Sequence, residues 1–244
     1  MVLQNIITCE KCTNHACFLK MYGALMNTNL VETKKLQLDK LHGQFIIHEG
    51  DPILGLFFLQ KGKIKILYSG LNGNPQIVRL VNTGESLCFR GFGRKIYSSS
   101  SVALEDSRVC FFETDDFMGV CNVSQLSNHL VSYLGNELEI AENRLKYLMQ
   151  MNVREKSAEA LLFIRKSFGL NDNNELNVYI SRKDIAAIAG TSEELIIRQL
   201  SEFEKEKLIE RRNHGSIIGF LDENRLIKLV SKYNVFSQLP SAQI

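Results

Sequence analysis

Residues 181–220 read SRKDIAAIAG TSEELIIRQL SEFEKEKLIE RRNHGSIIGF, and this stretch decides the fold. Residues 181–184 (SRKD) have the pattern of a capping box that begins a helix, and Gly190 ends that helix. Residues 191–194 (TSEE) predict a second capping box, which begins a helix whose inward-facing side chains are Leu195, Ile196, Leu200 and Phe203. Two helices joined by a tight glycine turn are typical of a helix-turn-helix.

The end of the same stretch predicts a β-hairpin. Residues 208–212 (LIERR) and 216–220 (SIIGF) have the length and apolar content of strands, and residues 213–215 (NHG) supply a turn between them. A hairpin that directly follows a helix-turn-helix is a wing. An apolar helix over residues 158–168 precedes both, so the C-terminal part of the chain predicts a winged helix-turn-helix.

A long helix is predicted upstream, over residues 124–152. Apolar side chains recur there at steps of four and three, which is the spacing of a coiled-coil seam. The residues of this stripe are Leu134, Leu138, Ala141, Leu145, Leu148 and Asn152. The charged residues beside it predict a solvated rim, made of Glu137, Glu139, Glu142, Arg144 and Lys146. The pattern favours a dimer seam, and the alternative is a helix packed on its own domain.

Residues 20–120 read as rich in β-structure. Turn signals containing glycine, proline and asparagine separate six short apolar runs, at residues 44–47, 56–59, 64–68, 77–81, 102–104 and 109–112. Many short strands at regular spacing predict a β-barrel or jelly roll.

The composition, with 45% hydrophobic and 23% charged residues, is that of a soluble globular protein. No apolar run approaches the roughly 20 residues of a membrane-spanning helix, and the N-terminus lacks a secretion signal. We therefore expect a cytoplasmic protein with no membrane partner. The net charge of +2 argues against a non-specific DNA-packaging protein. No phosphate-binding glycine loop, nucleophile elbow or metalloprotease helix is found, so we expect no enzyme activity.

Six cysteines in a cytosolic chain are not expected to form structural disulfides, because that compartment is reducing. Three of them crowd together near the N-terminus as Cys9, Cys12 and Cys17, which points to metal or redox chemistry. The others are Cys88, Cys110 and Cys121.

Over nearly its whole length the chain resembles the CRP/FNR family of bacterial transcription regulators. The segments that carry the resemblance are residues 43–52 (GQFIIHEGDP), 61–66 (KGKIKI), 84–87 (GESL) and 101–104 (SVAL) in the β-rich region, and 191–209 in the helix-turn-helix. The resemblance implies an α+β fold with an N-terminal double-stranded β-helix, a jelly roll of the cyclic-nucleotide-binding type. A long dimerisation helix and a C-terminal winged helix-turn-helix would follow it.

The domains implied in this way are a cysteine-rich arm (1–19), a sensor β-barrel (20–122), the dimerisation helix (123–152) and the DNA-binding domain (153–244). The resemblance also implies a homodimer that binds a palindromic site on double-stranded DNA and works with RNA polymerase.

The first residues of the second helix in such a motif face base edges in the major groove. Here these residues are Ser192, Glu193, Glu194, Ile197 and Arg198. By resemblance, Glu194 and Arg198 match the base-reading glutamate and arginine of the family, which suit cytosine and guanine. The alternatives are that Glu194 only closes the capping box and that Arg198 contacts phosphate or a surface acid. Glu193 and Ile197 depart from well-known members, so the operator sequence is not predicted.

Other basic residues are expected to contact phosphates, which position a protein on DNA without specifying sequence. They are Arg182, Lys183, Arg211, Arg212 and His214. An ordinary solvated surface is the alternative for each of them.

A typical cyclic-AMP site is not expected in the barrel. Relatives that bind cyclic AMP hold its phosphate with a glycine-glutamate pair and an arginine-serine pair, and here Cys88-Phe89 and Ser98-Ser99 stand at those positions. Arg90 and Arg94 lie nearby, so a pocket for another small anion, lined by Arg90, Arg94, Ser98 and Ser99, is the alternative sensor prediction. Arg90 pairing with a surface acid is the other possibility.

An iron–sulfur site fits the sequence better. Cys9, Cys12 and Cys17 supply three thiolates, and a 4Fe–4S cluster needs four. By resemblance to oxygen-sensing members, Cys110 on a late strand is the fourth, although the gap before Cys17 is one residue shorter than theirs. The alternatives are zinc held by Cys9, Cys12, His15 and Cys17, or a metal-free arm. Cys88 and Cys121 match no ligand position and are expected to be small buried hydrophobes.

The predicted function is therefore DNA-binding regulation that responds to oxygen or redox state through the cluster. The alternative is a regulator of the same type that responds to an anion in the barrel. None of the residues at the seam positions named above carries a charge, so nothing obvious opposes dimerisation. We therefore expect a dimer that persists without the cluster.

Overall fold

The computed structural model describes residues 7–15, 17, 20, 35–70, 73–87, 94–120, 124–215 and 217–233. Within helices and strands, the side chains of residues 118–120, 124–126, 129 and 214 are left out of this description. Contacts divide the chain into two units, residues 1–68 with 81–137 and residues 69–80 with 138–243.

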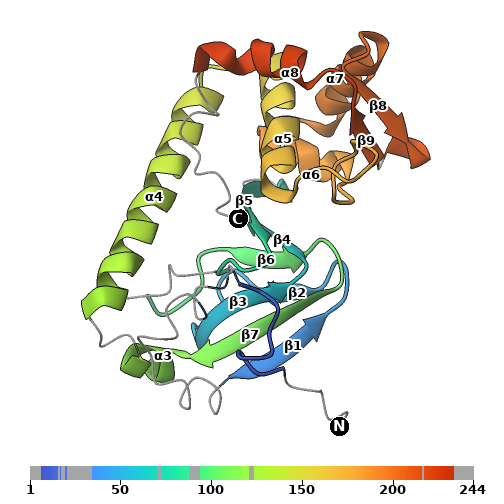
Figure 1. Ribbon diagram of the computed structural model, residues 1–244. Helices are drawn as coiled ribbons and strands as arrows, with labels where there is room; N and C mark the ends of the chain where they lie inside the picture. The colour runs from blue at the N-terminus through green and yellow to red at the C-terminus, as the bar shows by residue number, and fades with distance from the viewer. Residues whose placement is uncertain are drawn as a thin grey trace. The chain divides into compact units, whose positions relative to one another are not determined.

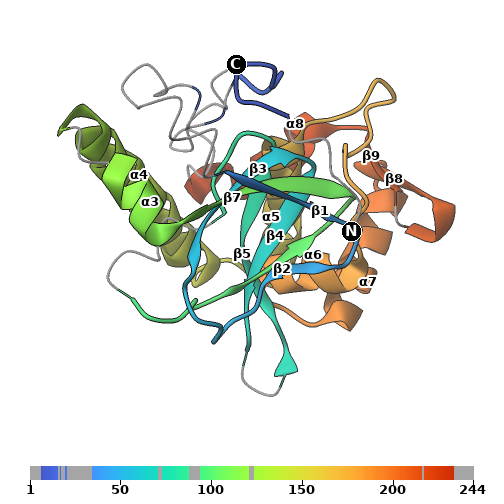
Figure 2. The same cartoon turned by 90° about the horizontal axis from the view of Figure 1, so that it is seen from below.

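Two antiparallel sheets build the β-rich region (Figures 1 and 2). One has the strand order β1-β7-β3, formed by β1 (Leu36–Lys40), β7 (Ser107–Glu113) and β3 (Gly55–Lys61). The other has the order β2-β6-β4-β5, formed by β2 (Phe45–Ile47), β6 (Ser100–Ala103), β4 (Lys63–Tyr68) and β5 (Gln76–Asn82). Each of the six predicted runs overlaps a strand, so the predicted β-rich region is confirmed.

Side-chain alternation gives the sheet β1-β7-β3 two different faces. On one face Phe57, Leu59 and Val109 belong to the buried core, together with Ile64 and Ile66 of β4. On the other face the residues between them, including Cys110, point away from this core. This second face of the sheet is where the candidate cysteine site forms.

Strand β1 is missing from the sequence-based prediction, and its pattern explains why. Leu36 and Leu38 are exposed, whereas Gln37 between them is buried. A strand is normally recognised by buried apolar residues alternating with exposed polar ones, and here the order is reversed. The burial of Gln37 has its own cause, because its amide bonds to the N-terminal arm.

A short helix, α3 (Thr114–Val120), leads to the long helix α4 (Ser124–Leu148). The predicted long helix is confirmed, but Asn152 is not part of it. Asn152 has extended backbone angles and caps the next helix, α5 (Val153–Phe168), so the apolar stripe of α4 ends at Leu148. Within the described residues, no helix has both the length and the apolar character needed to cross a membrane.

The prediction that Arg144 belongs to a solvated rim is wrong. Its side chain is 12% exposed and forms a two-pronged ion pair with Glu159 of α5, whose side chain is 2% exposed. The same guanidinium donates to the carbonyl of Ile188 and lies 4.1 Å from the ring centroid of Phe163. Arg144 therefore joins the end of α4 to two helices of the second unit. The spacing could not reveal this, because its partners are 15 and 44 residues away.

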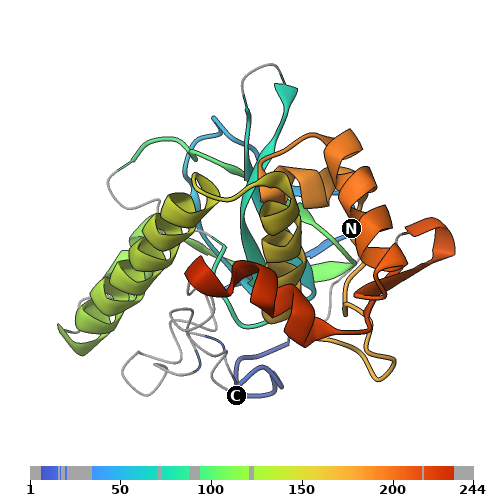
Figure 3. The same ribbon diagram turned by 90° about the horizontal axis from the view of Figure 1, so that it is seen from above.

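The second unit is built around α5, which packs against α6 (Arg182–Ala189), α7 (Glu193–Lys205) and α8 (Glu223–Val230). Figure 3 shows α8, in red, crossing α5. A capping box begins α5, in which Asn152 and Glu155 satisfy each other's backbone N–H groups. Glu155 also accepts from Tyr233 and Lys232 in the 3₁₀ turn η4 (Ser231–Tyr233) after α8. Burial raises the pKa of Glu155, but these hydrogen bonds bring it below the ordinary value.

Candidate functional site

The helix-turn-helix begins as the sequence predicts. The Ser181 hydroxyl accepts from the backbone N–H of Asp184 at 3.0 Å and caps α6. Gly190 ends α6 in the left-handed conformation, with φ of +62°, which a glycine adopts without strain. The turn is thereby tight enough to bring α7 against α6.

The second predicted cap is displaced by one residue. Ser192, and not Thr191, is the N-cap of α7, and its hydroxyl accepts from Leu195 N–H at 3.3 Å. Thr191 is part of the turn, where its N–H donates to the carbonyl of Ala186. Glu194 is then the second residue of the helix. It therefore does not close a capping box, which was the alternative role considered for it.

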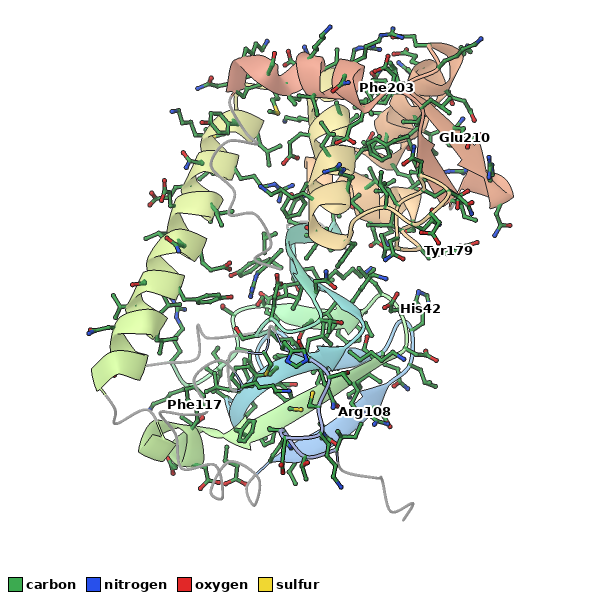
Figure 4. The ribbon with its side chains drawn as sticks, viewed as in Figure 1. His42, Arg108, Phe117, Tyr179, Phe203 and Glu210 are labelled. Atoms are coloured by element: carbon green, nitrogen blue, oxygen red, sulfur yellow. The ribbon has the colours of Figure 1, made fainter. Side chains whose placement is uncertain are left out.

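Helix α7 has one buried face and one exposed face. Ile196, Leu200 and Phe203 are fully buried, and Figure 4 labels Phe203 among the packed side chains of this unit. The residues predicted to face DNA are exposed: Ser192, Glu193, Glu194, Ile197 and Arg198. The helix therefore presents one face of its N-terminal half to solvent, as a DNA-reading helix must.

The wing is a hairpin of β8 (Ile209–Arg212) and β9 (Ile217–Phe220), joined through the 3₁₀ turn η3 (Asn213–Gly215). Figure 4 labels Glu210 on β8. The pairing runs from Ile209 opposite Phe220 to Arg212 opposite Ile217. The predicted hairpin is confirmed.

The basic residues predicted to contact phosphate differ in their exposure and in the residues that they contact. Lys183 is exposed, and the guanidinium of Arg182 lies against Gly215 of the wing turn. Arg211 is bound by Glu204, at 2.6 Å, and this hydrogen bond lowers the pKa of Glu204. Arg212 bridges Glu175 and Glu210 while staying exposed. The side chain of His214 lies outside the described residues. Arg211 would have to leave Glu204 to reach a phosphate.

The seam residues of α4 are only partly covered. Leu138 and Leu145 are 59% and 62% exposed, Ala141 is exposed, and Leu134 and Leu148 are half-buried. Val131, which the sequence analysis does not include, is 68% exposed and lies seven residues before Leu138. The seven-residue spacing between Val131 and Leu138 could have identified Val131 as part of the stripe.

Four cysteines meet on the face of the sheet β1-β7-β3 that points away from the core. Cys9, Cys12 and Cys17 of the arm and Cys110 of β7 line one pocket, and all four are free thiols. Cys110 stands opposite Gln37 of β1 and Phe58 of β3, which line the same pocket. In Figure 4 sulfur atoms, in yellow, lie over β7 and β1. Cys88 and Cys121 lie outside the described residues.

Side-chain amides attach the arm to this face. The Gln37 amide accepts from Ile7 N–H at 2.8 Å and donates to Ile7 C=O at 3.0 Å, as a neighbouring strand would. Asn14 donates to the carbonyl of Leu59, and the amides of Gln60 and Gln37 donate to the sulfurs of Cys12 and Cys110, both at 3.7 Å. These contacts hold the three arm cysteines near Cys110.

The four thiols are half-buried, and two lysines lie beside them. Burial raises the pKa of the Cys110 thiol to about 12, while a hydrogen bond from Gln37 and the charge of Lys35 act in the opposite direction. The ammonium of Lys35 donates to the sulfur of Cys9 at 3.2 Å, and that of Lys20 to the carbonyl of Cys12. Neither lysine and neither glutamine is predicted from the sequence, because only the folded sheet brings them to the cysteines.

The two metal groups considered for these cysteines require different spacings of their ligands. Within the described residues, no three His, Cys, Asp or Glu side chains are arranged to hold one metal ion. Around one zinc ion, thiolates would stand about 3.8 Å apart, from tetrahedral geometry and the usual Zn–S length. In a 4Fe–4S cluster each thiolate binds a different iron, so its ligands stand farther apart. His15, the fourth ligand of the zinc alternative, is exposed and does not line the pocket.

The alternative anion pocket is only partly described. Arg94 is exposed, and Ser98 and Ser99 are half-buried just before β6. Arg90 lies outside the described residues. This pocket stays a prediction.

Comparison with known proteins identifies both units. Residues 41–124 match the cyclic nucleotide-binding domain, and residues 147–229 match the Crp-like helix-turn-helix domain. The chain belongs to the CRP/FNR family of transcription regulators. It is therefore a DNA-binding transcription regulator and not an enzyme.

Three similar proteins illustrate the relationship. Electron transport regulator A of Shewanella oneidensis is 28% identical over 203 residues, which cover 81% of this chain and 78% of that protein. The fumarate and nitrate reduction regulatory protein of Escherichia coli K12 is 27% identical over 186 residues, with coverages of 74% and 72%. The structure of FixK2 from Bradyrhizobium japonicum has a TM-score of 0.70 at 19% identity and covers 80% of this chain and 96% of its own. The last comparison confirms the fold.

Proposed function

We propose that this CRP/FNR-type regulator belongs to the FNR-like branch and responds to oxygen or redox state through a 4Fe–4S cluster. The observation that carries the proposal is the meeting of Cys9, Cys12, Cys17 and Cys110 at one pocket, with amide and ammonium donors around them. When bound, such a cluster supplies one-electron redox chemistry. Two relatives are named for electron transport and for fumarate and nitrate reduction, which are redox processes.

The contribution of the protein is to hold the arm. The Gln37 amide pairs with the backbone of Ile7, and Asn14 reaches the carbonyl of Leu59. Cys110 sits on a strand of the sheet, so a cluster shared by Cys110 and the arm cysteines would tie the arm to the barrel. Loss of the cluster would remove this link and weaken the attachment of the arm, which is how a redox signal would change the structure.

The direct test is anaerobic purification followed by iron and sulfide assays and an absorption spectrum. A brown protein with about four iron atoms per chain is the expected result. A protein that stays colourless and iron-free after anaerobic reconstitution with iron and sulfide would refute the cluster. Zinc in place of iron would support the alternative that the arm is a zinc site.

We further propose that the chain acts in the cytoplasm as a homodimer on a palindromic operator and contacts RNA polymerase. Val131, Leu138 and Leu145 expose large apolar side chains at seven-residue spacing along α4, which is the pattern of one side of a coiled-coil seam. A second copy of the same helix is the partner that such a self-complementary stripe fits.

The dimer is expected to persist without the cluster. The apolar positions of the stripe carry no charge, so no electrostatic repulsion along the seam opposes pairing in the apo protein. Size-exclusion chromatography with light scattering on iron-free protein measures this, and a mass of two chains is expected. Leu138→Glu is the matched variant, since two facing glutamates should separate the chains. An apo wild-type protein that elutes as a monomer would contradict the prediction.

Arg198→Ala is expected to weaken binding to the operator by about 1–3 kcal/mol and to relax specificity at one base position. Arg198 is exposed and is the sixth residue of α7, the helix that Ser192 caps, so the change should not disturb the fold. Gel shifts on the operator and on single-base variants measure both effects.

Lys183→Ala provides the contrast. Lys183 is exposed on α6 and is proposed to contact phosphate, so its loss should weaken binding to all sequences alike and reduce the salt dependence. If Arg198→Ala behaves in the same way as Lys183→Ala, with no change of specificity, Arg198 does not read a base.

A further inference from the structure

A buried lysine stands beside the cysteine pocket. Lys35, just before β1, is 3% exposed, and its ammonium donates to the Cys9 sulfur at 3.2 Å and to the Ile7 carbonyl at 2.9 Å. Lys35 and Lys20 both line the pocket, and none of the described residues that line it is acidic. The lining therefore combines four thiols with two cations.

Negative charge in the pocket would suit this lining. Moving an ammonium out of water costs several kcal/mol, and a nearby negative charge offsets part of that cost. Thiolates would supply such charge, and a hydrogen bond from an ammonium to an ionised acceptor is roughly twice as strong as a neutral one. Four thiolates around a 4Fe–4S cluster carry a net negative charge, which matches a cationic lining.

We propose that Lys35 is a positioning residue for the cluster, which donates to the Cys9 thiolate and offsets the charge of the bound group. The inference rests on the proposed function, since it needs a cluster at this pocket. Hydrogen bonds to the sulfurs and the local charge are among the features that set cluster potentials. Lys35 should therefore both retain the cluster and raise its reduction potential.

Lys20 is the matched comparison. Its ammonium lines the same pocket but donates to the carbonyl of Cys12 at 2.5 Å and not to a sulfur. Lys20→Met removes the same charge as Lys35→Met and leaves the contact with Cys9 in place. A difference between the two variants therefore isolates the hydrogen bond to the sulfur from the general effect of positive charge.

The experiment uses the full chain, reconstituted anaerobically, as wild type, Lys35→Met and Lys20→Met. Iron per chain, the rate of iron loss to a chelator and the reduction potential are measured, with circular dichroism as the check of folding. Lys35→Met is expected to lose iron about ten-fold faster than wild type and to have a lower potential, because a charge-assisted hydrogen bond is removed. Lys20→Met should change less.

Lys35→Gln is the second variant, included in case Lys35→Met folds poorly. Its amide keeps a neutral hydrogen-bond donor in place of the ammonium. An intermediate rate of iron loss is expected for it. Wild type with a cluster, together with unchanged iron loss and potential in the Lys35 variants, overturns the role of Lys35 and leaves the cluster standing. Wild type that takes up no iron overturns the proposed function and this inference with it.

Discussion

Cys110→Ser is expected to reduce iron binding to less than about half of the wild-type content while the chain still folds. Cys110 is the one cysteine of the pocket that a strand holds in place, between Gln37 of β1 and Phe58 of β3. Serine is nearly isosteric with cysteine, but its hydroxyl does not replace a thiolate as a ligand of iron. Fewer than about half of the wild-type iron atoms per chain should remain after anaerobic reconstitution, since a cluster with three thiolates is poorly held.

The same variant should keep the wild-type fold. Circular dichroism and thermal unfolding should be close to those of wild type, because the side chain packs on the outer face of the sheet and not in the core around Val109. Cys88→Ser is the control, since Cys88 matches no ligand position in the sequence. Wild-type iron content in Cys110→Ser would remove Cys110 from the ligand set, and a loss in Cys88→Ser would bring Cys88 into it.

The elements of the fold that the sequence predicts correctly are those whose signals are local. The six apolar runs of the barrel, the helix cap at Ser181, the glycine turn at Gly190 and the wing hairpin each depend on residues within a few positions of one another. The displaced cap at Ser192 shows the limit of such signals. Thr191 and Ser192 are both good capping residues, and only the turn geometry after Gly190 selects the second.

The missing elements depend on contacts between distant segments. Strand β1 could not be predicted from the sequence, because its buried residue is the polar Gln37. Gln37 is buried where it bonds to Ile7, 30 residues away. Arg144 reads as a surface residue because its neighbours in the sequence are charged, whereas its partners are on α5 and α6. Lys35 has no signal at all in the sequence. The cysteine ligands themselves are predicted from their crowding and from the family resemblance, but their donors are not.

Arg144→Met is expected to lower the free energy of unfolding of the second unit by about 3–5 kcal/mol, because it leaves the Glu159 carboxylate buried without a partner. Arg144 binds Glu159 at 3.0 and 3.4 Å and donates to Ile188 C=O at 2.9 Å. The unfolding midpoint in urea measures the loss. Arg165→Met is the matched control, because the ion pair of Arg165 with Glu223 is on the surface and is expected to contribute at most about 1 kcal/mol.

The double variant Arg144→Met with Glu159→Met tests the cause. If the cost of Arg144→Met comes from an unpaired buried charge, removing the second charge should restore most of the stability, because apolar side chains of similar volume can replace a buried ion pair. The carbonyl of Ile188 still loses its donor in the double variant, so recovery is expected to stop short of wild type by about 1 kcal/mol. A double variant no more stable than Arg144→Met would mean that packing of the arginine over Phe163, and not its charge, holds α4 to α5.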